Sequence, residues 1–191
     1  MSQGVKVFLA VLVVLALVLF GVVSWGIGQY NRVVTMDEKV DSSWAQVENQ
    51  LKRRYDLIPN LVETVKGYAK HERELFEKIA EARTKYFQQT SVQQKISAAN
   101  QLEGTLSRLL LLQEQYPQLK ANESFLKLQD SLEGTENRIA VERQRYNETV
   151  RELNTYRRTV LGRFFASLAG VGEAPYYALP EGQGETPKVT F

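Results

Sequence analysis

The sequence contains no cysteine and a single histidine, His71. The absence of cysteine excludes disulfide cross-links, thiol catalysis and cysteine-ligated zinc or iron–sulfur sites. A single histidine excludes metal sites that need a pair of histidines from one chain. The 24 Lys and Arg residues nearly balance the 22 Asp and Glu residues, which argues against a dedicated nucleic-acid-binding protein. A length of 191 residues allows one domain of ordinary size.

One apolar stretch dominates the N-terminal region. Residues 7–23 read VFLAVLVVLALVLFGVV, and residues 24–27 extend the stretch to about 31 Å of helix, enough to cross a bilayer. A cleaved signal peptide is disfavoured, because the apolar core is long and no A-x-A-like cleavage site follows it. Trp25 and Tyr30 are typical of the aromatic belt at a membrane–water interface. We therefore expect residues 1–28 to form a single-pass membrane anchor.

Positive charges beside the anchor bear on its orientation. Lys6 and the terminal amine precede the apolar stretch, and Arg32 and Lys39 follow it. The two sides are nearly balanced, but a short N-terminal tail is easily retained in the cytoplasm. We expect the plasma (inner) membrane as the location, with the remaining chain on the extracytoplasmic side.

Residues 40–69 carry a helical stripe of apolar side chains. Its steps are three or four residues long, and its members are Val40, Trp44, Val47, Leu51, Tyr55, Ile58, Val62, Val65 and Ala69. Thr35 and Glu38 have the spacing of a capping box, which predicts a helix start. Pro59 interrupts the stripe. Either the helix kinks there, or it ends and Pro59 opens the next helix.

Two further helices are predicted from their caps. Thr90 or Ser91 can cap a leucine-rich helix that ends before Tyr116, and Asn122 can cap the last helix. Apolar residues then recur every seven positions at Phe125, Leu132, Ile139, Tyr146, Leu153 and Val160, which indicates left-handed bundle or coiled-coil packing. We expect an all-α fold: a transmembrane helix, then a long antiparallel, up-and-down bundle of four-helix type over residues 29–169. Residues 170–191 should form an irregular tail rich in Pro and Gly.

The length of the last helix suggests self-association. At about 57 Å it exceeds the leucine-rich helix, which spans about 33 Å, although the first two helices could cover part of the difference. Val150 and Leu153 in its distal half would then face a second protomer or the bilayer. We expect homo-oligomers, with polar contacts from Arg138, Glu142 and Arg143.

The segment Tyr156–Leu168 is a candidate lipid contact. It places Phe164 and Phe165 with other apolar residues mostly on one helix face, and it supplies Arg157, Arg158 and Arg163 for lipid phosphates. The alternative is the ordinary end of a bundle helix, where the C-terminal dipole favours cations. Both interpretations stay open at this point.

Two other clusters fit simpler explanations. Lys52, Arg53 and Arg54 are adjacent and therefore spread around a helix, so we expect a solvated face paired with Glu48 and Asp56 rather than a phosphate site. His71 lacks a Glu-x-x-His pair, so we expect no metal site there.

Polar residues are dense in the last helix. They comprise Glu136, Asn137, Arg138, Glu142, Arg143 and Asn147, to which Glu63 of an earlier helix can be added. Such a set can form a buried network, a partner site or a catalytic pocket. No Gly-rich phosphate loop and no G-x-S-x-G motif accompanies it. We therefore favour a structural network or an oligomer contact, and predict no catalytic residue and no cofactor.

Two long strings resemble the LemA family. Residues 30–72 read YNRVVTMDEKVDSSWAQVENQLKRRYDLIPNLVETVKGYAKHE, and residues 116–154 read YPQLKANESFLKLQDSLEGTENRIAVERQRYNETVRELN. Tyr55 departs from the family pattern, since many relatives carry His there, and residues 160–164 replace its usual FP stretch. The resemblance implies a membrane anchor, an antiparallel helical bundle and a joint between helices at Pro59. It implies no enzymatic activity and no settled molecular role.

The resemblance also bears on partners. Family relatives are discussed beside exported TPM-domain proteins, and one branch is tied to magnetosome formation, which implies membrane-associated assembly. We therefore expect a membrane-anchored, self-associating scaffold or adaptor of the bacterial cell envelope, with a TPM-domain-type protein as a candidate partner. The alternative is a membrane-remodelling or stress-linked factor that acts through lipid contact of the bundle. Neither role involves nucleic acid.

Overall fold

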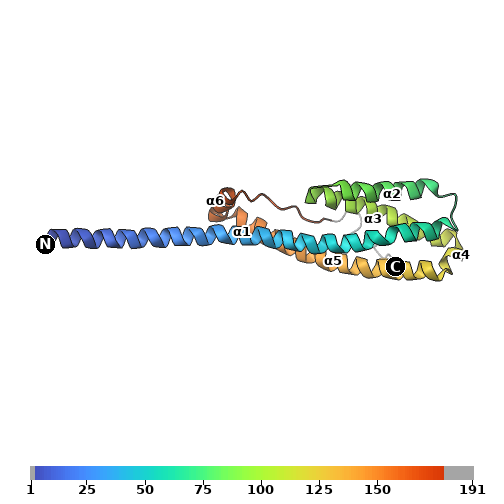
Figure 1. Cartoon of the computed structure of the whole chain (residues 1–191), viewed down its shortest axis with the longest axis horizontal. Coiled ribbons are helices and arrows are strands. Elements are labelled where there is room, and N and C mark those ends of the chain that lie inside the picture. Colours follow the sequence, from blue (N-terminus) through green and yellow to red (C-terminus); the bar gives the residue numbers. More distant parts are fainter. Residues whose placement is uncertain (1–2, 179–191) are drawn as a thin grey trace, which may run out of the picture. The chain divides into compact units, whose positions relative to one another are not determined.

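The computed structural model describes residues 3–178, apart from the side chains of residues 5–7, and shows six helices (Figure 1). These are α1 (Gln3–Lys66), α2 (Arg73–Gln88), α3 (Val92–Gln115), α4 (Pro117–Lys120), α5 (Glu123–Arg158) and α6 (Val160–Ala169). No strand occurs within this range, and the expected all-α fold is confirmed. The chain divides into two compact units. We call Met1–Asp41 with Thr149–Ala174 the anchor unit, and Ser42–Glu148 with Pro175–Phe191 the bundle unit.

The first part of α1 has the properties of a membrane span. It is the one described helix long and apolar enough to cross a bilayer, and its most apolar window is not buried in the protein. Large apolar side chains from Phe8 to Ile27 are exposed. Apolar surface of this extent is stable in lipid rather than in water.

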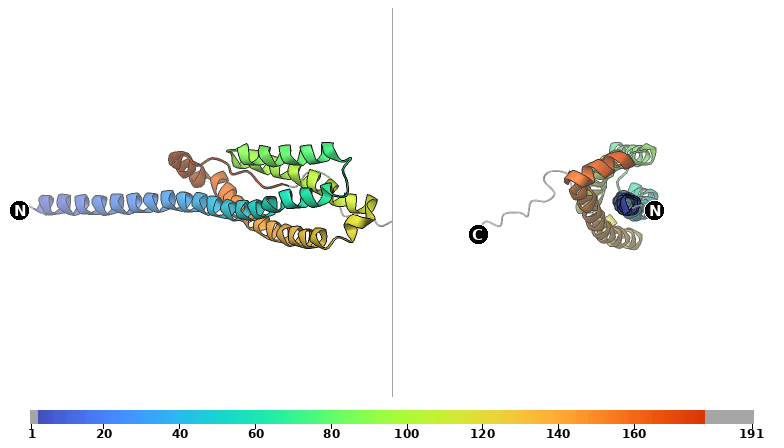
Figure 2. Two further views of the ribbon diagram at one scale, coloured as in Figure 1. Left: turned by 45° about the vertical axis from the view of Figure 1, so that its right-hand side comes forward. Right: turned by 90° about the vertical axis from the view of Figure 1, so that its left-hand side faces the viewer.

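The bundle unit packs four helices around one core, as Figure 2 shows for α1, α2, α3 and α5. Short connections make consecutive helices antiparallel. The apolar stripe of α1 is buried except for Val62, which is half-buried, whereas neighbouring Leu61, not predicted in the stripe, is buried. On the predicted seven-residue seam of α5, Phe125, Leu132, Ile139 and Tyr146 are buried. Both predicted caps are present: Ser91 Oγ accepts from Gln94 N–H at 3.3 Å, and Asn122 Oδ1 accepts from Phe125 N–H at 2.9 Å.

The predicted joint at Pro59 is wrong, because α1 continues through Pro59 to Lys66. Proline has no N–H to donate to the carbonyl four residues earlier, which is that of Tyr55. Arg83 of α2 donates its Nε–H to this oxygen at 3.1 Å. The chain turns after Gly67 instead, before α2 begins at Arg73. The expected capping box is also wrong, because Thr35 lies inside α1 and its hydroxyl donates to Asn31 O at 2.8 Å.

The last helix is shorter than expected. It ends at Arg158, and Thr159 caps a separate helix, α6, by accepting from Gly162 N–H at 3.0 Å. Val160 therefore leaves the seam and is 89% exposed. Gly170 ends α6 in the left-handed region, with φ of 70°. Residues 171–178 follow without a helix, and residues 179–191 of the expected tail lie outside the described part of the chain.

Candidate functional site

The centre of the bundle unit contains a buried cation. Lys52 and Arg53 are exposed as expected, but Arg54 is only 4% exposed, so the expected solvated face does not include it. Its guanidinium pairs with Glu103 of α3 at 2.8 Å and with Glu136 of α5. A buried charge is stable only when such partners compensate its lost hydration. Arg54 thus links three helices.

Other charges near this centre are also paired across helices. Glu48 pairs with Lys95 of α3, and Asp56 lies 3.8 Å from the Arg83 guanidinium of α2. Both acids were expected to pair with the cluster on their own helix, but these ion pairs join α1 to α3 and α2 instead. The local spacing predicted correctly that these acids form ion pairs, but the predicted partners were wrong.

Two buried tyrosines complete the centre. The rings of Tyr55 and Tyr86 meet edge to face with centroids 4.7 Å apart. Burial raises the pKa of both phenols, so they stay neutral at physiological pH. His71 is exposed, and the residues that the structure describes include no group of three or more potential metal-ligating side chains. The carboxylates at this centre are paired with Arg54, and the buried Tyr86 hydroxyl has no hydrogen-bond partner among the described residues.

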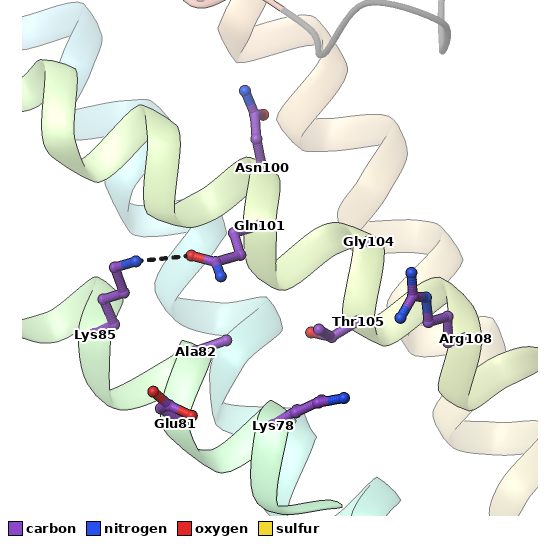
Figure 3. A pocket seen from close by; sticks show the side chains of 9 residues that line it. All are labelled: Lys78, Glu81, Ala82, Lys85, Asn100, Gln101, Gly104, Thr105 and Arg108. Atoms are coloured by element: carbon purple, nitrogen blue, oxygen red, sulfur yellow. Dashed lines mark hydrogen bonds between the residues drawn. The ribbon is translucent and has the colours of Figure 1, made fainter. Parts of the chain in front are cut away.

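A hollow of about 550 Å³ lies between α2 and α3 (Figure 3). Lys78, Lys85 and Arg108 line it together with Glu81. Lys85 Nζ donates to Gln101 Oε1 at 3.0 Å, across the two helices. The four charged side chains that line the hollow are exposed, and one of them is acidic. The hollow therefore lacks a desolvated charge that would select a ligand.

An extended segment docks on the bundle unit. We call residues 175–178 the strap. The Asn147 side chain grips its backbone twice: Nδ2–H donates to Tyr177 O at 3.0 Å, and Oδ1 accepts from Tyr177 N–H at 2.8 Å. Tyr146 donates its hydroxyl to Pro175 O at 2.7 Å, and Asn100 of α3 donates Nδ2–H to Ala178 O at 3.0 Å. Four backbone groups of the strap are thus hydrogen-bonded to side chains of α3 and α5.

In the anchor unit, α6 packs on the end of the apolar stretch. The Phe165 ring meets Trp25 edge to face, with centroids 6.0 Å apart. Close by along α1, Gln29 Oε1 accepts from the Tyr156 hydroxyl at 2.9 Å, and the Arg32 guanidinium lies 4.9 Å from the centre of the Tyr156 ring. These contacts fix the end of α5 and the start of α6 beside the residues that follow the membrane span.

The candidate lipid-contact residues fall into two groups. Phe164 is exposed on α6 with Val160, Leu161 and Leu168, whereas Phe165 is buried against Trp25. Arg157, Arg158 and Arg163 line one hollow of about 490 Å³. Arg158 lies 3.9 Å from Glu173, which leaves the hollow with an excess of positive charge.

The candidate oligomer contacts are not gathered on one surface. Val150 and Leu153 are fully buried within the chain and therefore do not face a second protomer. Arg138 is exposed, whereas Glu142 pairs with Arg145 at 2.8 Å and the Arg143 guanidinium lies over the Tyr177 ring at 5.7 Å. The length comparison failed because α1 accompanies α5 in the anchor unit, where both helices line a common hollow.

Sequence reasoning missed three features. Glu103 was not singled out, and neither was the interaction between Arg83 and Tyr55. The strap was assigned to an irregular tail. One available signal was the pair Asn147 and Asn154, seven residues apart on α5. In the anchor unit Asn154 grips Ala174 as Asn147 grips Tyr177, by donating to Ala174 O at 2.9 Å and accepting from Ala174 N–H at 3.1 Å.

Comparison with known proteins supports the family resemblance. The chain is similar to magnetosome protein MamQ 2 of Paramagnetospirillum magneticum, with 26% identity over 85% of this chain and 69% of that protein. It is also similar to magnetosome protein MamQ of Magnetospirillum gryphiswaldense, with 24% identity over the full chain and 78% of that protein. The model of the LemA family matches residues 43–191. This membrane-associated helical protein belongs to the LemA family.

Proposed function

We propose that this protein is a membrane-anchored helical adaptor of the cell envelope, and that α6 lies in the bilayer interface. The packing of Phe165 on Trp25 carries this proposal. Trp25 lies near the end of the apolar stretch, a position where tryptophan favours the headgroup region. A helix that rests on this ring is held at the same depth. Val160, Leu161, Phe164 and Leu168 of α6 are exposed and therefore available to the acyl boundary.

The arginine hollow supports the same arrangement. Arg157, Arg158 and Arg163 surround a space where a lipid phosphate could accept charge-assisted hydrogen bonds. The Nε of Arg157 is buried and has no hydrogen-bond partner among the described residues. Basic groups close to an apolar helix face are typical of attachment to anionic membranes.

Probe depth in nanodiscs of anionic lipid tests the proposal. Because the chain lacks cysteine, Phe164→Cys gives a single labelling site for an environment-sensitive fluorophore. We expect blue-shifted emission, and quenching by a spin label near the lipid headgroup. Ser107→Cys on an exposed position of α3 is the matched control and should report water. Equal, aqueous emission from both probes would refute the interfacial position of α6.

As part of the adaptor role, we propose that the protein also associates with itself. Exposed Val141 and Arg138 lie three residues apart on α5 and supply a mixed apolar and basic surface. A TPM-domain-type protein is a second candidate partner, which rests on the family resemblance alone. Cross-linking in native membranes with linkers of several lengths tests both, since homo-oligomers give a ladder of monomer multiples. A single monomeric band under all linkers would contradict self-association.

Membrane remodelling is the alternative function, and the exposed apolar face of α6 is the observation that favours it. A helix that inserts shallowly enlarges one leaflet, and the likeness to proteins named for the magnetosome supports a role in membrane-associated assembly. Electron microscopy of liposomes that contain the full chain, compared with a Phe164→Ser variant, separates the two roles. Remodelling predicts tubules or small vesicles with the wild-type chain only.

A further inference from the structure

The strap is held in a manner that resembles ligand binding more than core packing. An asparagine amide offers one donor group and one acceptor, which match the C=O and N–H of a single residue. Asn147 uses both on Tyr177, with bonds of 3.0 and 2.8 Å. This pair of bonds recognises the backbone and therefore accepts any residue that has a backbone N–H. The main chain of an extended peptide is what such a group selects.

One side chain adds selectivity to this backbone recognition. Tyr177 is 5% exposed, and its ring lies 6.3 Å from that of Trp44 and beneath the Arg143 guanidinium. Neighbouring Tyr176 is exposed. The site thus buries one aromatic ring between an indole and a cation, and leaves the adjacent side chain in solvent.

We infer that Asn147, Trp44 and Arg143 form a peptide-binding groove for an extended segment that carries a tyrosine, and that the strap is its intramolecular occupant. Asn100 and Tyr146 complete the groove by donating to the carbonyls of Ala178 and Pro175. In the anchor unit, the Asn154 side chain makes the same pair of hydrogen bonds to the backbone of Ala174, so this mode of backbone recognition occurs twice on α5. This role is independent of lipid contact by α6.

A covalently attached occupant competes strongly with a free peptide. Its effective concentration is in the millimolar range for a short flexible connection. A partner segment therefore enters only where the strap is released. Gly170 and Gly172 precede the strap, and glycine lowers the barrier to such a change in backbone direction.

A peptide competition experiment tests the groove in the full chain, in detergent micelles. The probe is a fluorescein-labelled synthetic peptide of residues 171–178, VGEAPYYA. The variant Tyr177→Ala weakens the internal strap, so it should bind the peptide saturably, at least tenfold more tightly than the wild-type chain does. Tyr176→Ala is the matched control and should behave as wild type. Adding Asn147→Ala to Tyr177→Ala removes two hydrogen bonds and should weaken binding by tenfold or more.

Three results would overturn the inference. The first is that the Tyr177→Ala chain keeps the helix content of the wild type but does not bind the peptide saturably. The second is that peptide binding by the Tyr177→Ala chain is unchanged when Asn147→Ala is added. The third is that the wild-type chain binds the peptide as tightly as the Tyr177→Ala chain does. Hydrogen exchange of the wild-type chain needs no variant. The Tyr177 amide should exchange at least tenfold faster than the Tyr146 amide of α5, through local release of the strap. Exchange of both amides at the same slow rate would identify the strap as a fixed part of the core.

Discussion

Pro59 and Arg83 should be energetically coupled through one carbonyl oxygen. Pro59 leaves the Tyr55 carbonyl without its helical donor, and Arg83 Nε occupies that position at 3.1 Å. The variant Arg83→Met keeps most of the aliphatic stem but removes the donor from this part-buried oxygen. An unsatisfied polar group of this kind costs about 1–3 kcal/mol, and we expect a loss near the lower limit because Arg83 is partly exposed.

The matched background is Pro59→Ala, in which residue 59 regains an N–H that can donate to Tyr55 O along the helix. There Arg83→Met should cost about 1 kcal/mol less than in the wild-type background. Arg83 also lies 3.8 Å from Asp56 and 5.1 Å from the centre of the Phe87 ring. Both contacts are lost in either background, so they cancel in a double-mutant cycle.

Urea unfolding of the four full-length chains in detergent, followed by far-UV circular dichroism, gives the free energies of the cycle. The coupling should exceed the scatter of independent sites, which is about 0.5 kcal/mol. A coupling below that value would refute the reasoning, since it would mean that water or another group serves the Tyr55 carbonyl as well as Arg83 does.

Three further predictions concern the seam, α6 and the strap. Leu132→Asp should destabilise the bundle by about 3 kcal/mol or more, because it places a carboxylate in the core; an unchanged melting temperature would contradict the buried seam. Gly162→Ala should disrupt the start of α6, since its Cβ would lie 1.9 Å from Tyr156 O, whereas Gly134→Ala has open space and should be tolerated; proteolysis of the two variants compares them. Burial raises the pKa of Tyr177 to about 12, so the stability that its neutral ring provides is complete below about pH 10 and is lost as the pH approaches 12; absorbance titration against Tyr177→Phe measures this, and an ordinary pKa would contradict it.

Helix boundaries could be predicted where the decisive residues are local. The cap at Ser91 involves Gln94, and the cap at Asn122 involves Phe125, each only three positions away. For each cap, the sequence therefore contains both hydrogen-bonding partners within one short window. Gly67 follows the last residue of α1 and is a local signal of the same kind, since glycine often ends a helix. The end of α1 was not predicted there because the apolar stripe continues past Gly67 to Ala69.

Burial of charge could not be predicted from the same window. Arg53 and Arg54 are adjacent and chemically identical, yet one is exposed and the other is buried. The difference depends on Glu103 and Glu136, which approach from α3 and α5. The rule that proline ends a helix failed for a similar reason, because Arg83 comes from another helix. Both outcomes are set by partners distant in sequence.

The burial of Val150 and Leu153 shows that the protein core includes the distal half of α5. These residues were expected to face a second protomer or the bilayer, because the last helix is longer than the leucine-rich helix. Instead α1 continues through the anchor unit, where Val33 is buried as well. One helix therefore exposes its apolar side chains up to Ile27 and is part of a protein core from Val33 onward. The hydrogen bond that Tyr156 donates to Gln29 and the contact of the Arg32 guanidinium with the Tyr156 ring lie in the short interval between these two parts of α1. Since α6 begins only four residues after Tyr156, the chain itself holds the exposed apolar face of α6 beside the end of the apolar stretch of α1, as the proposed interfacial position of α6 requires.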